Sequence, residues 1–127
     1  MPVIGTIVMY DPRHNFKAVP GEALTQGESV YISSDGLVYA VDDGKSDVCH
    51  GWALTDGVAN GAPITIVKYC RMKVDTTQTI GARVYTGAVS GGSAPSTTYA
   101  ATGLVVGWAI ADDEVIVTAP NPPAADG

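Results

Sequence analysis

The chain has 127 residues, of which 46% are hydrophobic and 16% charged, and its formal net charge is −6. At this length a single domain removes roughly two thirds of its unfolded surface from water, so the chain can hold a core of its own. The acidic balance, without a basic cluster, excludes nucleic acid as an expected partner, because contacts from Lys and Arg to phosphates dominate that binding.

The N-terminal segment, MPVIGTIVMY at residues 1–10, is apolar. No basic segment precedes it and no small-residue cleavage site follows it, so the sequence predicts no signal peptide. No stretch approaches the roughly 20 apolar residues of a membrane-spanning helix, and we expect no membrane partner and synthesis in the cytoplasm. We expect residues 1–19 to form an extended arm and entry loop ahead of a single β domain over 20–118.

Residues 29–41, SVYISSDGLVYAV, predict a β-hairpin. β-branched and aromatic runs flank Asp35 and Gly36, and an Asp-Gly pair supplies the positive φ angles that a tight turn needs. Residues 64–74, ITIVKYCRMKV, predict a strand with one apolar face. The apolar residues of one parity are Ile64, Ile66, Cys70, Met72 and Val74, and Lys68 interrupts them.

Two further strands are predicted near the C-terminus, LVVGWAI at 104–110 and EVIVTA at 114–119. Residues 86–103 are so rich in Gly, Ser and Thr that we expect a long loop. The tail, APNPPAADG at 119–127, cannot continue a central strand, because proline lacks the amide donor. We therefore expect an extended C-terminal tail.

A short phrase occurs twice and carries both tryptophans: GWALTD at 51–56 and GWAIAD at 107–112. A second phrase precedes each copy at nearly the same distance, GESVY at 27–31 and GARVY at 81–85. We interpret this pattern as a weak internal duplication, with units over about 25–74 and 79–118. Two copies are too few for a solenoid, so we expect the two β units to close on each other.

The repeated phrase predicts four structural anchors, Gly51, Trp52, Gly107 and Trp108. A missing side chain beside a large ring allows a bulge or a close approach between strands. We expect both tryptophans to occupy equivalent positions in or beside the core. The alternative is that either ring lies exposed at an interface, where tryptophan is over-represented.

The cysteines and histidines do not predict a metal site. Cys49 and Cys70 are the only cysteines, and without an export signal we expect two buried or half-buried free thiols. Together with His14 and His50 they show no C-x-x-C or H-x-x-x-H spacing that would arrange four zinc ligands.

Other candidate motifs are also incomplete. The acidic turns at 42–47 and 112–114 lack the ligand spacing and the closing glutamate of a calcium loop. The stretch AVSGG around Ser90 has Ala88 where a nucleophile elbow has its first glycine. We therefore expect no metal, no cofactor and no catalytic residue.

Four pieces follow one another along residues 20–118: GEALTQGESVYISSDGLVYAVDD, GWALTDGVANGAPITIVKYCRMKVD, IGARVYTGAVSGG and VGWAIADDEVIV. Their order resembles that of the small capsid decoration, or cement, proteins of tailed bacteriophages. In that pattern G-x-x-V-Y and a D-G-x-V hairpin lead to G-x-A-L, a G-x-x-V-x-V-V strand, a second G-x-x-V-Y and V-G-x-A. This chain departs from it by a tryptophan after both motif glycines and by the Pro-rich tail.

The resemblance implies a small β-barrel or sandwich-like domain of the β-tulip type, bound as a homotrimer to the outer surface of the virion. There it would clamp neighbouring major capsid proteins against the pressure of packaged DNA. The contact would lie in the N-terminal arm, whose strand-forming residues are Val3, Ile4, Ile7, Val8 and Tyr10. The alternative is a carbohydrate- or receptor-binding β module of a phage tail, with exposed tryptophans as stacking platforms.

Overall fold

The computed structural model describes residues 7–42, 48–74, 77–86, 95–97 and 104–119, and over these ranges the chain forms strands and turns without a helix. In chain order the strands are β1 (Val8–Arg13), β2 (Phe16–Ala18), β3 (Ser29–Ile32), β4 (Val38–Ala40), β5 (Gly51–Ala53), β6 (Ile64–Val67), β7 (Tyr69–Lys73), β8 (Arg83–Thr86), β9 (Leu104–Ala109) and β10 (Glu114–Thr118).

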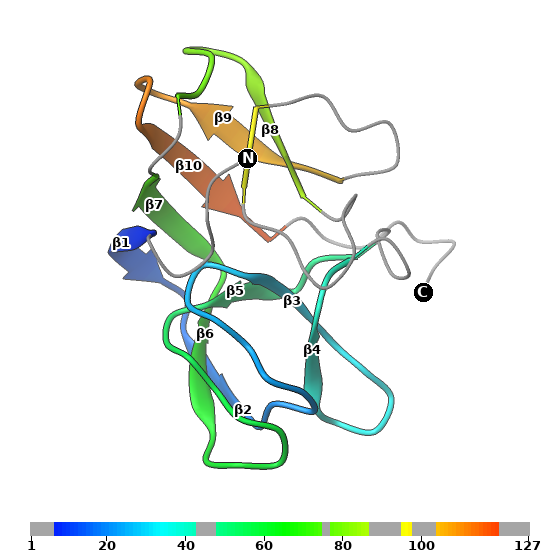
Figure 1. Ribbon diagram of the computed structural model, residues 1–127. Coiled ribbons are helices and arrows are strands. Elements are labelled where there is room, and N and C mark those ends of the chain that lie inside the picture. Colours follow the sequence, from blue (N-terminus) through cyan, green and yellow to red (C-terminus); the bar gives the residue numbers. More distant parts are fainter. Residues whose placement is uncertain (1–6, 43–47, 75–76, 87–94, 98–103, 120–127) are drawn as a thin grey trace.

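These strands form two antiparallel sheets of five (Figure 1). Sheet A has the order β1-β7-β10-β9-β8, and sheet B has the order β2-β6-β5-β3-β4. Neither sheet closes on itself, and apolar side chains from both fill the space between them. The expected all-β, sandwich-like domain is therefore confirmed.

Two long segments run through both sheets and bend where they change sheet. The first passes from β1 in sheet A to β2 in sheet B, and the second passes from β6 in sheet B to β7 in sheet A. Lys68 lies at the second bend, and its N–H donates to the carbonyl oxygen of Arg13 at the first, over 3.1 Å. The lysine that breaks the apolar parity of residues 64–74 thus marks the point where the strand leaves one sheet for the other.

The N-terminal segment is part of the domain rather than an arm, at least from Ile7 onward. β1 pairs with β7, β2 pairs with β6, and the Ile7 side chain is buried in the core between the sheets. The expected boundary at residue 20 is therefore wrong, because the open edges of β7 and β6 offer backbone partners to residues 8–18. Val3 and Ile4 lie outside the described residues.

The predicted hairpin at residues 29–41 is confirmed by β3 and β4, which pair in antiparallel register. Gly36 adopts a φ of +84°, and Asp35 Oδ1 accepts a hydrogen bond from the N–H of Leu37 over 2.9 Å. The predicted C-terminal strands are also confirmed, since β9 and β10 pair across the acidic turn. Most of the loop expected at 86–103, and the tail from residue 120, lie outside the described residues.

The internal duplication is visible in the strand pairing, which has the same register in both units. The paired residues are Ser29 with Trp52 and Val30 with Gly51 in the first unit, and Arg83 with Trp108 and Val84 with Gly107 in the second. The turns before these strands match as well, because Gly27 N–H donates to Ala53 O over 2.9 Å and Gly81 N–H donates to Ala109 O over 2.8 Å. The two units are therefore equivalent down to individual hydrogen bonds.

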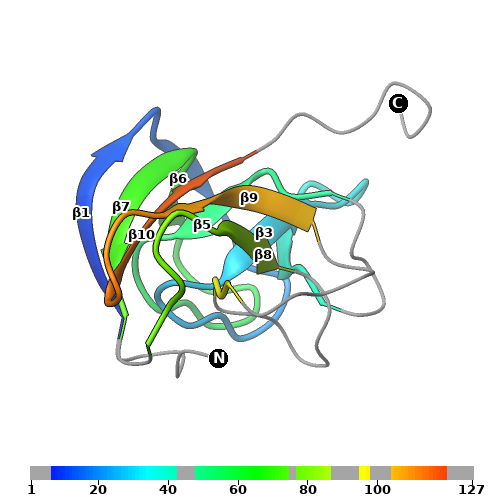
Figure 2. The ribbon, with the colours of Figure 1, turned by 90° about the horizontal axis from the view of Figure 1, so that it is seen from above.

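In the first unit, sheet B is covered on both sides. Its tryptophan side faces sheet A, and Trp52 belongs to the main core between the sheets. Figure 2 looks through sheet A toward sheet B. Its opposite side carries Val30, Ala53 and Ile66, which join Leu24 in a second apolar cluster. Every side chain of β5 is consequently buried.

In the second unit, the described residues cover sheet A on one side only. The counterparts of Val30, Ala53 and Ile66 are Val84, Ala109 and Val115, and all three face sheet B in the main core. The side of sheet A without tryptophan therefore covers the tryptophan side of sheet B. The two units stack in the same sense, and the tryptophan side of sheet A faces outward.

The glycine before each tryptophan permits a close approach to the neighbouring strand. A Cβ built on Gly107 would overlap the carbonyl oxygen of Ile116 in β10. A Cβ built on Gly51 would lie 2.9 Å from the carbonyl oxygen of Val67, the counterpart of Ile116. Both glycines thus serve the same steric purpose, as the sequence predicted.

We expect Gly107→Ala to reduce the free energy of unfolding by about 3 kcal/mol or more, because backbone cannot yield to the added methyl group. Gly36→Ala is the control: nothing lies within 4 Å of its Cβ position, so only left-handed strain of about 1–2 kcal/mol is added. Urea unfolding of both variants measures the difference. Equal losses would show that the close approach at Gly107 does not matter.

Candidate functional site

The two tryptophans differ in exposure although their strand registers are equivalent. Trp52 is 0% exposed, and its Nε1 donates to the carbonyl oxygen of Thr118 over 3.2 Å. Trp108 is 49% exposed. The expectation that both rings pack equivalently is therefore wrong for Trp108, because neither of the two described sheets covers its side of sheet A.

The outer side of sheet A carries a row of five side chains, one from each strand. Residues paired across antiparallel strands point to the same side of a sheet. The pairs are Tyr10 with Arg71, Arg71 with Ile116, Ile116 with Trp108, and Trp108 with Arg83. We call these five residues the outer row.

Charge within the outer row is balanced at Arg71. The Arg71 guanidinium lies 4.7 Å from the centroid of the Tyr10 ring, and its Nη1 donates to Glu114 Oε2 over 3.1 Å. Its Nε lies 3.9 Å from Asp11, which is beyond hydrogen-bonding distance. Arg71 is thus held flat against tyrosine with its charge neutralised, and it adds packing surface more than net charge.

Apolar side chains extend the row at one end of the sheet. Val8 precedes Tyr10 by two residues and Ile110 follows Trp108 by two, so alternation along a strand directs both to the outer side. They are 47% and 40% exposed, respectively. The outer row together with Val8 and Ile110 is called the outer face below.

Lys73 and Glu114 lie between Val8 and Ile110 in the strand pairing, so charged side chains accompany the apolar ones. A surface that combines aromatic side chains with arginine is typical of a contact site with another macromolecule.

The structure places some of the predicted anchors and contact residues on the outer face and others in the interior. Tyr10, Val8 and Trp108 lie together on the outer face, whereas Trp52, Gly51 and Ile7 belong to the interior. Sequence reasoning missed Arg71, Arg83 and Ile116 as members of this surface. The sequence did contain a signal for them: they occupy the positions that alternate with the buried apolar residues of their strands, and such positions point away from the core.

The two cysteines are free and buried, as predicted. Burial raises the pKa of the Cys49 thiol to about 12 and that of Cys70 to about 11. The thiolate form that reacts as a nucleophile or binds a metal is therefore scarce at neutral pH. Across the described ranges, no three His, Cys, Asp or Glu side chains are grouped so as to hold a metal ion.

Glu28 is the carboxylate most removed from solvent among the described residues, at 4% exposure. Burial raises its pKa, and its Oε1 accepts a hydrogen bond from Thr25 N–H over 2.6 Å. That bond closes the turn before β3, so the carboxylate has a structural partner.

The His50 side chain also has a structural hydrogen-bond partner, since its Nδ1 accepts from Ile32 N–H over 2.9 Å. Residues 43–47 and Ser90 lie outside the described part of the chain.

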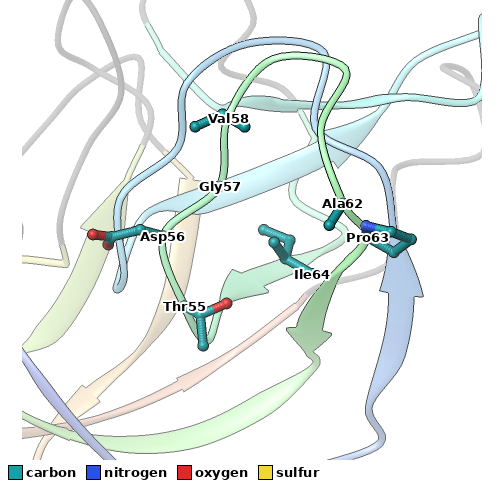
Figure 3. A pocket seen from close by; sticks show the side chains of 7 residues that line it. All are labelled: Thr55, Asp56, Gly57, Val58, Ala62, Pro63 and Ile64. Carbon is teal, nitrogen blue, oxygen red and sulfur yellow. The ribbon is translucent and has the colours of Figure 1, made fainter.

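A hollow of about 380 Å³ opens beside the loop between β5 and β6 (Figure 3). Its lining residues are Thr55, Asp56, Gly57, Val58, Ala62, Pro63 and Ile64. Asp56 is the charged residue among them, and its Oδ1 accepts a hydrogen bond from Gln26 N–H over 2.9 Å. The rest of the lining is apolar apart from the hydroxyl of Thr55.

No protein-family model, curated protein sequence or solved structure matches this chain. The likeness to capsid decoration proteins therefore depends on the sequence motifs of residues 20–118 alone. Over the described ranges, the chain has no helix that is long and apolar enough to cross a membrane.

We expect truncation of the two tryptophans to reduce the free energy of unfolding by very different amounts. Trp52→Ala should reduce the free energy of unfolding by about 3–5 kcal/mol, because it empties a core position. Trp108→Ala should cost less than about 1 kcal/mol, because the ring is half exposed. In Trp52→Phe, acrylamide should quench the remaining Trp108 strongly. Weak quenching there, or a large loss of stability in Trp108→Ala, would contradict the exposed placement.

Proposed function

We propose that this chain is a structural virion protein that binds the outer surface of a mature phage capsid and clamps neighbouring major capsid proteins. The resemblance of residues 20–118 to capsid decoration proteins supports the proposal, and so does the outer face of sheet A. The observation that carries it is Trp108: its counterpart Trp52 is covered by a sheet, whereas Trp108 is left 49% exposed.

The residue types of the outer face suit a protein contact. Tryptophan, tyrosine and arginine dominate the binding energy of interfaces, and the outer row contains all three. Burying apolar area contributes about 25 cal/mol per Å², and many copies on one lattice multiply a modest affinity per copy. The proposal places the capsid contact on this face, with Val3 and Ile4 as an additional tether.

The proposed role is mechanical and assigns no catalytic residue or cofactor. A clamp needs a rigid body and a complementary surface. The β sandwich provides the first through its two apolar clusters, and the outer face provides the second. Association as a homotrimer belongs to the same proposal, because neighbouring capsid subunits meet at symmetry positions.

Co-sedimentation with expanded, undecorated capsids tests the proposal. We expect saturable binding that Trp108→Ala weakens by about tenfold or more, since an exposed ring becomes buried at the contact. Val58→Ala is the matched control, because it truncates another exposed apolar side chain in the loop after β5. Removal of residues 1–6 measures the separate contribution of Val3 and Ile4.

The outcomes distinguish the parts of the proposal. Absence of the wild-type protein from the capsid pellet at saturating concentration would refute capsid binding. Equal binding by wild type and Trp108→Ala, with loss on removal of residues 1–6, would move the contact from the outer face to the N-terminus.

The second candidate function is a carbohydrate- or receptor-binding module. Trp108 favours it, because an exposed indole on a flat sheet, with Arg83 beside it, is a platform for stacking a sugar ring. Titration with phage-receptor glycans, followed by isothermal titration calorimetry, decides between the two, because calorimetry does not depend on the tryptophan that the variants remove. We expect no saturable heat on the capsid proposal; saturable binding that Trp108→Phe weakens and Trp108→Ala abolishes would establish the binding module instead.

A further inference from the structure

Basic side chains gather in a hollow at the bend where the chain passes between the two sheets. The hollow has a volume of about 350 Å³ and is lined by Arg13, His14, Lys68, Tyr69, Thr118 and Ala119. None of these residues is acidic, although the chain as a whole carries a net charge of −6. Positive charge is therefore concentrated locally in an acidic protein.

The backbone around this hollow is connected by hydrogen bonds between three strand segments. Lys68 N–H donates to Arg13 O over 3.1 Å, and Ala119 N–H donates to Lys68 O over 2.8 Å. His14 adopts a φ of +58°, an uncommon conformation for a residue other than glycine, at the turn between β1 and β2. The basic residues thus project from fixed backbone at the bends of both long segments.

The basic groups of the hollow differ from Arg71 and Lys73 of β7 in their partners. Arg71 is paired with Glu114, and Lys73 lies 3.8 Å from Asp113. Within the described part of the chain, no carboxylate lies within ion-pairing distance of the three basic residues of the hollow. The Arg13 guanidinium lies over the Tyr69 ring, 5.7 Å from its centroid, which restrains its orientation and leaves its N–H groups free to donate.

We propose that this hollow binds one oxyanion group, a carboxylate or a phosphate, through Arg13 and Lys68, with His14 at the rim. A guanidinium presents parallel N–H donors to two oxygens of either group, and an ammonium adds a compact charge beside it. The ring of Tyr69 forms the apolar wall.

Tyr69 and Thr118 lie two positions from Arg71 and Ile116 along β7 and β10, so the hollow borders the outer face. None of its lining residues belongs to the outer face, so variants of the hollow test the anion site separately from the capsid proposal.

The buried tryptophan provides a reporter for this site. Trp52 Nε1–H donates to the carbonyl oxygen of Thr118, which lines the hollow, whereas Trp108 lies in the outer row. Inorganic phosphate and acetate are titrated separately into the full chain in dilute Tris chloride, and the two indole signals are followed by NMR. We expect a saturable shift of the Trp52 signal and none of the Trp108 signal, and the anion with the lower Kd identifies the group that the site prefers.

Matched variants separate a specific site from general charge effects. We expect Arg13→Ala and Lys68→Ala each to raise the Kd about tenfold, because each removes a charge-assisted hydrogen bond. Arg83→Ala and Lys17→Ala remove the same charges elsewhere, on β8 and on β2 where Lys17 Nζ donates to Thr65 Oγ1, and should change the Kd less than twofold.

Two results would overturn the inference. One is the absence of a saturable Trp52 shift with both anions. The other is an equal change of Kd in all four variants, which would show that the net charge of the chain, and not this hollow, governs anion binding. Neither result depends on whether the chain binds capsids.

Discussion

The contact on which the fold depends is the burial of the Trp52 side of sheet B beneath the apolar side of sheet A. It brings the largest side chain of the main core into a fully enclosed position and satisfies its single donor at Thr118. Indole burial without that acceptor would cost the hydrogen bond that water supplies. The same contact holds the second unit against the first, and the two long segments bend where they pass from one sheet to the other.

When two equivalent units stack in the same orientation, the outer side of the second unit lies outside the contact between them. The side of sheet B without tryptophan carries the second apolar cluster, which includes Leu24. Over the described ranges, no further unit covers the tryptophan side of sheet A. A head-to-tail contact uses a different side of each unit, unlike one with a twofold axis, so a stack of two leaves one side of each unit outside the contact. The exposed indole is therefore a consequence of the architecture, and the residues around it decide what the exposed surface can contact.

The second unit differs from the first at the positions that surround its tryptophan. Ser29 and Val67 neighbour Trp52, and the corresponding neighbours of Trp108 are Arg83 and Ile116. The change to arginine keeps the outer face compatible with water while the ring is retained. The large ring on the surface favours a role in contact with another molecule. Tryptophan contributes more binding energy than most residues when an interface buries it.

Local patterns accounted for much of this structure. Apolar parity and turn chemistry identified the hairpin at Asp35 and the strands of both units, because these preferences depend on neighbours in sequence. They predicted one strand over 64–74, which the structure divides at Lys68 between β6 in sheet B and β7 in sheet A. The basic hollow could not be predicted, since Arg13, Lys68 and Thr118 come together only through strand pairing. The sequence by itself determined two β units with a glycine at each close approach between strands. The lack of a Cβ lets the neighbouring strand come close, and this effect does not depend on which sheet packs over the unit. Only the tertiary structure decided which tryptophan is buried, because two locally equivalent motifs differ in burial solely through the sheet that covers one and leaves the other open.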